Sequence, residues 1–415
     1  MKSKKITYFK YFSLFFTIAV LVFIAGCSGA PPSTPNIGQI AYNTDTGIDY
    51  DTIQKAIDAA GSGETIIVYS GIYEEKIKFN NKNITVRSAD PSDPDIVAAT
   101  VIDGGGSGAV VQFVSGDEST LEGFTIRNGN SGGYGGGIFI LSSDPTITDN
   151  TITDNTAHLK GGGIFISFGD PTITGNTITG NTVTTEDGGG IFMSNSNPAI
   201  TDNTITDNTA AVRGGGINVD NNSNPIIIGN TINDNQATAG GGINVDNNSS
   251  PTITGNTIEY NMAEGGGGIF ILSSDPVITG NTITYNQAGG GGGIYVDNNS
   301  SPAITGNTIT YNTGGVSGGG ISVYDSSPII TGNTITYNQA GYGGGGGIFV
   351  YPNSNLQPDD FRPAGWGTSR ENIPTGATLD PAEGEEYTIA GNEFLGNEHG
   401  TSLDYTEGAH VYFFK

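Results

Sequence analysis

A Gly-Gly-Gly-Ile motif recurs through most of this chain at a nearly constant interval, and the repeat constrains the fold more than any other feature. The isoleucine after each glycine triplet occupies positions 138, 164, 191, 217, 243, 269, 294, 321 and 348. Successive repeats therefore begin 25 to 27 residues apart. A period of this length predicts a solenoid, in which each repeat forms one coil and contacts only its neighbours.

Each repeat contains short segments in which apolar and polar residues alternate. Ile217 and Val219 share one face while Asn218 takes the other, and in each Thr-Ile-Thr segment the isoleucine opposes two threonines. A period of two indicates strands. Three such segments in about 26 residues predict an all-β fold, a right-handed parallel β-helix solenoid with three strands per coil. Leucine-rich repeats would need a denser leucine pattern.

Asparagines recur with the same period, and stacking places equivalent residues of neighbouring coils about 4.8 Å apart. We therefore expect ladders in which side-chain amides bond one another and satisfy the backbone of the turns. One ladder comprises Asn150, Asn176, Asn203, Asn230, Asn256, Asn281, Asn307 and Asn333, and the other comprises Asn155, Asn181, Asn208, Asn235, Asn261, Asn286, Asn312 and Asn338. The glycine triplet predicts a tight turn with positive φ and close approach of the coils.

The segment before the repeats predicts a short helix that caps the solenoid. Asp51 and Gln54 fit the start of a helix, and Gly61 fits its end. Ile53, Ala56, Ile57 and Ala60 would share the buried face. Strands are expected around 65–68, 76–79 and 83–86. Residues 41–134 then form the N-terminal cap and irregular coils.

The period breaks after residue 351. The regular coils span 135–351, and the next match to Ile330 is Ile389, which implies an inserted loop at 352–386. Residues 387–415 would form the last coil and a C-terminal cap, because an open coil exposes an unpaired strand edge. The segment 409–414 fits a closing strand. One β-helix domain would thus cover 41–415.

The first 26 residues have the layout of an export signal. Four lysines precede an apolar run from Tyr11 to Ile24, which leads to Ala25, Gly26 and Cys27. The small residues before the only cysteine resemble a bacterial lipobox, which implies cleavage before Cys27 and acylation of that residue. Residues 27–40 would be a tether rich in Pro, Ser and Gly. We expect export and a lipid anchor in the cell envelope, facing outward.

The charge of the chain limits its partners. The net charge is −26, and loss of residues 1–26 would leave 11 basic and 41 acidic residues, a net charge of −30. Nucleic acid is therefore not expected as a partner, because binding it needs positive charge against phosphate. A single cysteine excludes an internal disulfide. We expect a monomer that contacts the membrane only through its anchor.

The repeats resemble those of the right-handed parallel β-helix superfamily, the pectate-lyase-like group. The Gly-Gly-Ile and Asn-Thr-Ile motifs carry the resemblance, and "TIQKAIDAAGSGETIIVYSGIYEEKI" is similar to the usual start of such domains. The repeats are also similar to those of chlamydial polymorphic outer-membrane proteins, with a literal Phe-x-x-Asn at 394–397. The superfamily includes lyases, hydrolases, epimerases, tailspikes and adhesins, so the fold alone implies no single activity.

Charged residues that break the repeat are the candidates for catalysis. Lys160, Asp187 and Arg213 occupy one position in three successive coils, with His158 nearby and Asp207 at the end of a strand. The resemblance to lyases implies carboxylates that hold calcium and a basic residue that takes a proton beside a sugar carboxylate. Alternatively, the three residues form a ladder of alternating charge.

Two pairs of acids are candidates for calcium. Asp220 and Asp246 lie one coil apart, as do Asp144 and Asp170. Like charges at that spacing repel, and bound Ca²⁺ would relieve the repulsion. The alternative is that all four are solvated turn residues.

Aromatic columns are the most concrete candidate surface. The position after the Gly-rich turn holds Phe139, Phe165, Phe192, Phe270, Tyr295 and Phe349, and a four-coil column holds Tyr260, Tyr285, Tyr311 and Tyr337. Exposed aromatic columns stack on sugar rings or pack on a partner, although aromatic residues also suit strands.

Three functions remain open from the sequence. The first is a surface-anchored module that binds carbohydrate or another surface and catalyses nothing. The second is a lyase or hydrolase that acts on acidic polysaccharide. The third is a structural protein whose outward threonines resemble the flat arrays of ice-binding faces, although Asn233 and Glu259 interrupt that array. The uniform coils and the lack of a clear acid–base set favour the first.

Overall fold

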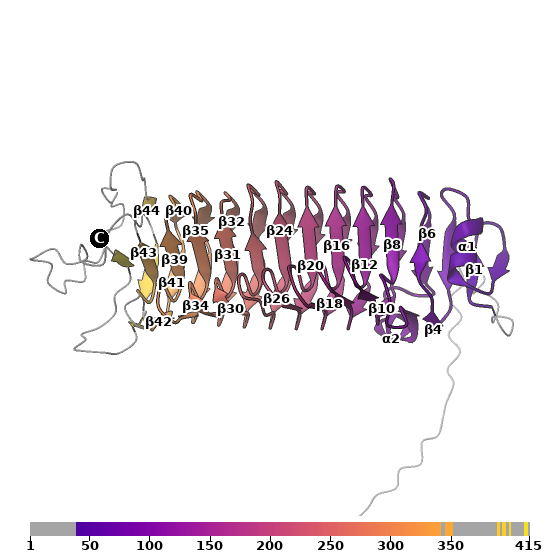
Figure 1. Ribbon diagram of the computed structural model, residues 1–415, viewed down its shortest axis with the longest axis horizontal. Helices are drawn as coiled ribbons and strands as arrows, with labels where there is room; N and C mark the ends of the chain where they lie inside the picture. The colour runs from indigo at the N-terminus through magenta and orange to yellow at the C-terminus, as the bar shows by residue number, and fades with distance from the viewer. Residues whose placement is uncertain are drawn as a thin grey trace, which may run out of the picture. The chain divides into compact units, whose positions relative to one another are not determined.

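The computed structural model describes residues 39–341, 345–351, 388–390, 392–395, 398–399 and 411–413. Coils stack side by side along the long axis of Figure 1 and form the predicted parallel β-solenoid. Equivalent strands of neighbouring coils pair in parallel and in register, so that Ile138 lies opposite Ile164 and Ile164 opposite Ile191. The signal segment, Cys27, the tether up to residue 38 and the insertion at 352–386 lie outside the described residues.

Three long columns of strands confirm the predicted three strands per coil. The first column runs from β5 (Ile77–Lys78) to β47 (Val411–Phe413), and the second ends at β44 (Thr388–Ala390). The third runs from β4 (Gly71–Glu74) to β45 (Glu393–Leu395). In the coils that follow residue 137, the first column contains β12 (Ile138–Leu141), β16 (Ile164–Ser167), β20 (Ile191–Ser194), β24 (Ile217–Asp220), β27 (Ile243–Val245), β31 (Ile269–Leu272), β35 (Ile294–Asp297), β39 (Ile321–Tyr324) and β43 (Ile348–Tyr351).

The same coils supply matching strands to the other two columns. The second column contains β13 (Thr146–Thr148), β17 (Thr172–Thr174), β21 (Ala199–Thr201), β25 (Ile226–Ile228), β28 (Thr252–Thr254), β32 (Val277–Thr279), β36 (Ala303–Thr305) and β40 (Ile329–Thr331). The third contains β14 (Thr151–Thr153), β18 (Thr177–Thr179), β22 (Thr204–Thr206), β26 (Thr231–Asn233), β29 (Thr257–Glu259), β33 (Thr282–Thr284), β37 (Thr308–Thr310) and β41 (Thr334–Thr336).

A fourth, interrupted column lies between the third column and the glycine turns, and the sequence did not predict it. One part contains β11 (Asn130–Ser131), β15 (Thr156–Ala157), β19 (Thr182–Val183) and β23 (Thr209–Ala210). The other contains β30 (Met262–Gly265), β34 (Gln287–Gly290), β38 (Thr313–Gly314), β42 (Gln339–Ala340) and β46 (Glu398–His399). Most of these strands have only two residues, too few for a period of two to be visible in the sequence.

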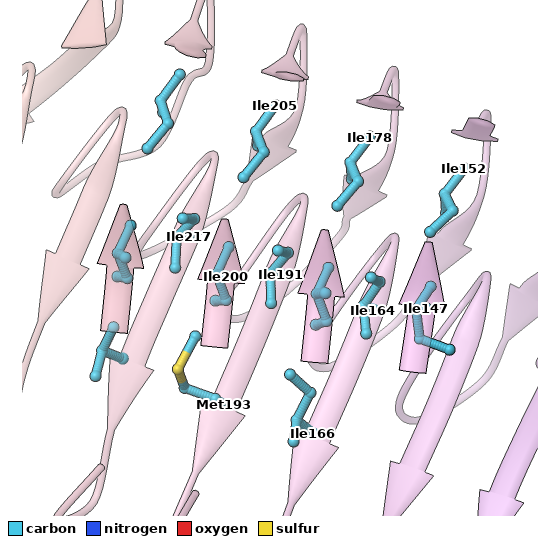
Figure 2. Close-up of a cluster of buried hydrophobic side chains, with 14 of the residues drawn as sticks. Ile147, Ile152, Ile164, Ile166, Ile178, Ile191, Met193, Ile200, Ile205 and Ile217 are labelled. Atoms are coloured by element: carbon cyan, nitrogen blue, oxygen red, sulfur yellow. The ribbon is translucent and has the colours of Figure 1, made fainter. Parts of the chain in front are cut away.

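The interior is a continuous stack of isoleucine, as the repeat predicted. Figure 2 shows Ile147 and Ile152 of one coil and Ile164 at the start of the next, with equivalent side chains repeated along the stack. All three side chains are fully buried. Burial of each such side chain stabilises the fold by roughly 1.5–3 kcal/mol relative to exposure. A coil alone has nothing to cover this face, so stability comes from stacking.

The two asparagine ladders form as predicted. Asn181 is buried, and its Oδ1 accepts bonds from the backbone N–H of Asn155 at 3.1 Å and from Asn155 Nδ2 at 3.0 Å. Its own Nδ2 donates to the Ile152 carbonyl at 2.9 Å and to Asn208 Oδ1 at 3.0 Å. Each amide thus satisfies a turn of the preceding coil and bonds the next amide in line.

A third, serine ladder was missed from the sequence. Ser196 Oγ accepts a bond from the Gly169 N–H at 3.3 Å, and Ser223 Oγ accepts one from the Ser196 N–H at 3.2 Å. The members are Ser143, Ser196, Ser223, Ser249, Ser274, Ser300 and Ser326, and all are buried. Each stands two residues before a proline, a Ser-x-Pro signal that recurs with the period of the coils.

The glycine triplets make the expected tight turns. Gly214, the first of one triplet, has a φ of +63°. A Cβ atom on Gly215 would lie 2.5 Å from the Gly241 oxygen of the next coil, so the second glycine is required by space rather than by φ.

The N-terminal cap contains the predicted helix, with a different first residue. Helix α1 spans Ile53–Ala59, and its N-cap is Thr52, whose side chain accepts from the Lys55 N–H at 3.1 Å. The expectation that Asp51 begins the helix is therefore wrong, because Asp51 binds Lys55 Nζ at 2.8 Å instead. Ile53, Ala56 and Ile57 are buried as predicted.

The strands around this helix lie close to the predicted positions. Strand β3 (Thr65–Val68) is as expected, whereas β6 (Thr85–Ser88) begins two residues later than predicted. Strand β1 (Ala41–Asn43) pairs antiparallel with both β2 (Ile48–Tyr50) and β3. The remaining early strands are β7 (Thr100–Asp103), β8 (Val111–Val114), β9 (Thr120–Glu122) and β10 (Thr125–Arg127). A second short helix, α2 (Pro94–Ala99), was not predicted.

The last coil resumes at Ile389, where the sequence match, rather than the period, placed it. Ile389 pairs with Ile330, and β47 pairs with β43 as the expected closing strand. Among the described residues, no helix is both long enough and apolar enough to cross a membrane.

Candidate functional site

Four tyrosines form an exposed ladder on one corner of the solenoid. Tyr260, Tyr285, Tyr311 and Tyr337 each follow a strand of the third column and precede a buried asparagine of the second ladder. Neighbouring ring centroids are 5.1 Å apart, and the ring planes differ by 3°, 5° and 8°. The side chains are 44 to 48% exposed. This set is called the tyrosine ladder below.

The backbone at the tyrosine ladder is in the left-handed region. The φ angles of the four tyrosines are between +54° and +56°. In earlier coils the same position holds residues that adopt this conformation readily, namely Asp154, Gly180, Asp207 and Asp234. An L-residue there costs roughly 1–2 kcal/mol. Tyrosine is thus retained against the preference of the backbone.

The neighbouring corner shows that the turn itself does not require tyrosine. In the same coils, the residue after each strand of the second column has a φ of +64° and is glycine, at positions 255, 280, 306 and 332. A Cβ atom on any of these four glycines would meet nothing within 4 Å, so space does not restrict the residue either. The geometry of the turn therefore does not explain why this position holds tyrosine.

Polar groups on and beside the tyrosine ladder have no hydrogen-bond partner among the described residues. In the described part of the chain, none of the four hydroxyls makes a hydrogen bond, and neither do the side-chain amides of Gln287 and Gln339. Both glutamines are exposed and follow a ladder tyrosine by two residues. These groups offer donors and acceptors beside aromatic edges, a combination suited to a hydroxyl-rich ligand.

The first aromatic column is largely covered, contrary to expectation. Phe139, Phe165 and Phe192 do stack, with centroids 5.4 and 5.5 Å apart, but Phe165 is only 7% and Phe192 only 1% exposed. The ring of Tyr134 stacks on Phe165, and Lys160 Nζ lies 4.5 Å from the centre of Phe192. The loop before each glycine triplet therefore covers this column, a packing that sequence spacing does not reveal.

The second part of that column is also partly buried. Phe270 stacks on Tyr295 at 5.1 Å, and Tyr295 stacks on Tyr324 at 5.1 Å. Burial raises the pKa of the Tyr295 hydroxyl, and Phe349 is only 4% exposed. Tyr324 was missed from the sequence because it stands two residues after Ser322, at the end of the same strand.

The structure brings most of the proposed catalytic residues together, as an ion-pair cluster. Lys160 Nζ lies 3.7 Å from Glu186, 3.7 Å from Asp187 and 3.8 Å from Asp220. Arg213 Nη1 binds Asp246 Oδ2 at 2.6 Å. Burial raises the pKa of both Asp187 and Asp246, while the neighbouring cations act in the opposite direction. The side chain of Glu186 is partly exposed, but each cation also pairs with at least one buried aspartate.

His158 and Asp207 do not join this cluster. His158 Nδ1 is 3.0 Å from the Thr184 hydroxyl, and Asp207 accepts from Thr206 on the corner that holds the tyrosine ladder. Within the described residues neither forms an ion pair.

The four candidate calcium ligands have protein partners. Asp220 accepts from Asn247 Nδ2 at 2.6 Å and pairs with Lys160, and Asp246 pairs with Arg213. Asp144 accepts from the backbone N–H of Asp170 at 2.6 Å, and the Asp170 carboxylate accepts from Asn197 Nδ2 at 3.3 Å. In the part of the chain that the structure describes, no three His, Cys, Asp or Glu residues are grouped to hold a metal ion.

Comparison with family models places the chain among known repeat proteins. A model described as a right handed beta helix region matches residues 174–291 and 261–360. The chain belongs to the right-handed β-helix repeat superfamily. A second model, described as a protein of unknown function (DUF1565), matches residues 81–218 of this β-helix protein. Comparisons with curated proteins and with solved structures gave no significant match.

Two buried asparagines of this β-helix protein interrupt the first aromatic column. Asn218 and Asn244 stand between Phe192 and Phe270 on the outward face of their strands, and Asn244 Nδ2 donates to Asn218 Oδ1 at 2.8 Å. Asn218 Nδ2 and Asn244 Oδ1 have no partner. A ladder of two amides has one unpaired donor at one end and one unpaired acceptor at the other. The aromatic side chains on either side offer these two groups no conventional hydrogen-bond partner.

Replacement of Arg213 by methionine in this β-helix protein should destabilise it by about 3 kcal/mol at pH 7, because it leaves the buried Asp246 unpaired. Burial then holds the folded-state pKa of Asp246 still further above its unfolded value of about 3.9. A raised carboxyl pKa favours the folded state at low pH and loses that effect as pH rises. Urea titrations should therefore show a smaller loss at pH 4 than at pH 7.

The matched control is Lys55→Met, which removes a cation from the exposed pair with Asp51. We expect no measurable change in its urea midpoint. An equal loss for Arg213→Met at both pH values would contradict the assignment of the loss to the Asp246 charge.

Proposed function

We propose that this β-helix protein is a non-catalytic module that binds polysaccharide on the tyrosine ladder. The observation that carries the proposal is four exposed tyrosines in a left-handed backbone conformation where the adjacent corner uses glycine. Residues kept against a backbone preference are retained for another reason, and function is the usual one.

The chemistry of the surface supports a sugar ligand. Aromatic edges provide apolar contact, and free hydroxyl and amide groups provide hydrogen bonds on the same strip. A strip that repeats at 5.1 Å suits a ligand that also repeats, and a polysaccharide does. The ion-pair cluster supports catalysis less well, because its carboxylates and cations are engaged with one another.

Anchoring at Cys27 is part of the same proposal. The apolar run, the small residues before the only cysteine and the tether of 27–40 support it. Labelling of cells with a fatty-acid analogue should mark the wild-type protein and not the Cys27→Ala variant. Equal labelling of both proteins would refute the anchor and leave the binding proposal standing.

Substitution of all four ladder tyrosines by asparagine tests the binding proposal. Asparagine accepts the left-handed backbone, so the turns keep their conformation. Loss of three stacked ring pairs destabilises the variant by about 0.5–1.5 kcal/mol for each pair. Removal of tyrosine from four left-handed positions stabilises it by about 1–2 kcal/mol for each position, so the two effects largely cancel. We therefore expect a melting temperature within a few degrees of wild type. Retention on immobilised polysaccharides should fall about tenfold or more, or roughly 1.4 kcal/mol.

The matched control carries Asp154→Asn, Asp207→Asn and Asp234→Asn in the same column. It removes charge but no ring, and we expect its retention to equal that of wild type. Retention by the tyrosine variant equal to wild type would refute the proposal. Release of unsaturated sugar from an acidic polysaccharide, abolished by Arg213→Ala, would instead favour a lyase.

A further inference from the structure

We infer that the ligand is an uncharged linear polymer that lies along the solenoid axis, with one unit for each of the four rings. The inference rests on the proposed function and specifies its substrate class.

The direction follows from the stacking of the rings. Tyr285 and Tyr311 each have a parallel ring on both sides, with centroids 5.1 Å away. The inner rings therefore present edges and hydroxyls outward rather than open faces. A single sugar would meet only one or two hydroxyls, whereas a chain parallel to the axis meets the whole row. The row thus selects an extended ligand.

The charge follows from the residues around the tyrosine ladder. Between Pro276 and Val350 the only charged side chains are Asp297 and Asp325, and no lysine or arginine occurs there. Within this stretch of the chain, an anionic polymer would find no cation to pair with along the last three rings. At the other end, Asp234 precedes Tyr260 in the same column, and Glu259 adjoins it. These acids would repel an anionic chain that extended past the first ring.

The length follows from the two ends of the ladder. The column changes from Asp234 to Tyr260 at one end. At the other end Thr336 pairs with Leu395 in β45, the last described strand of the third column, and the next residue in the sequence is a glycine, which has no ring. Four rings with 5.1 Å between neighbours are thus available. That spacing is close to the length of one sugar unit in an extended chain, so affinity should stop rising near four units.

Calorimetric titration of the full chain with uncharged oligosaccharides tests this inference. The probes are β-1,4-linked glucose, mannose and N-acetylglucosamine series, from disaccharide to octasaccharide, and a tetragalacturonate as the anionic comparison. For at least one uncharged series we expect Kd to fall about tenfold or more from disaccharide to tetrasaccharide. From tetrasaccharide to octasaccharide it should change by less than about twofold. Tetragalacturonate should bind about tenfold more weakly or not at all.

A shortened ladder gives a second readout. In Tyr337→Asn, which leaves three adjacent rings, the plateau should begin at the trisaccharide. The inference would be overturned if tetragalacturonate bound more tightly than the uncharged tetrasaccharides, or if Kd kept falling up to the octasaccharide. Neither result would contradict the proposal that polysaccharide binds on the tyrosine ladder. A plateau unchanged in Tyr337→Asn would also overturn the inference.

Two further outcomes separate this inference from the proposed function. Loss of polysaccharide retention in every assay would reject the proposed function and the inference together. A second copy of the chain is the other partner with a matching repeat, since its own ladder has the same spacing. A wild-type dimer in light scattering that becomes a monomer when the four tyrosines are asparagine would overturn the inference in favour of self-association.

Discussion

Gly215→Ala should destabilise the solenoid by roughly 3–5 kcal/mol, because the new methyl group has no space. Its Cβ would lie 2.5 Å from the Gly241 oxygen and 2.6 Å from the Gln236 oxygen, both backbone atoms of the next coil. No change of rotamer relieves a contact with backbone, so two coils must separate where their strands pair. Urea unfolding should show the loss as a lower midpoint.

Gly255→Ala is the control for backbone strain. Gly255 has a φ of +64°, but a Cβ atom there would meet nothing within 4 Å. Its cost should be about 1–2 kcal/mol, from the left-handed conformation alone. If the two variants lost equal stability, close approach of the coils would not be the reason for the glycine triplets.

Asn208→Ala should cost about 3–5 kcal/mol, since it leaves several buried groups unpaired. Asn208 Oδ1 accepts from the Asn181 N–H at 3.1 Å and from Asn181 Nδ2 at 3.0 Å. Its Nδ2 donates to the Ile178 carbonyl at 2.8 Å and to Asn235 Oδ1 at 3.0 Å. No water reaches these groups in the interior, so the free-energy cost of their lost hydrogen bonds is not offset by hydration.

Thr209→Ala is the neighbouring control, because Thr209 is exposed on β23. Its unfolding free energy should differ from wild type by less than about 0.5 kcal/mol. Hydrogen exchange of the Asn181 amide, which Asn208 protects directly, should accelerate in Asn208→Ala and not in Thr209→Ala. Unchanged exchange in both variants would contradict the role assigned to the ladder.

The coils were predictable because their cause is periodic. A residue that recurs every 26 positions stacks on its own copies, so the buried isoleucines and the asparagine ladders follow from spacing alone. The serine ladder carried an equally regular Ser-x-Pro signal. The helix start was less predictable, since Asp51 and Thr52 are both good N-caps and only the observed bond to Lys55 decides between them.

The candidate site was predictable only in part. The four tyrosines stood out as a column, but their left-handed backbone conformation, which carries the functional argument, is visible only in the structure. The phenylalanine column looked equally exposed in sequence. Its burial depends on Tyr134 and Lys160, which occupy equivalent positions in successive coils but differ in residue type, so no repeated residue signals the cover. The pairing of Lys160 with Asp220 spans two coils and has no local signal.

Nitration of tyrosine in the presence and absence of bound polysaccharide tests the central claim most directly. Tyr260, Tyr285, Tyr311 and Tyr337 are 44 to 48% exposed, and Tyr134, at 44%, serves as an internal reference in the same molecule. Mass spectrometry should find the four ladder tyrosines protected by ligand and Tyr134 nitrated as in the free protein. Protection of Tyr134 alone, or of no tyrosine at ligand saturation, would contradict binding on the tyrosine ladder.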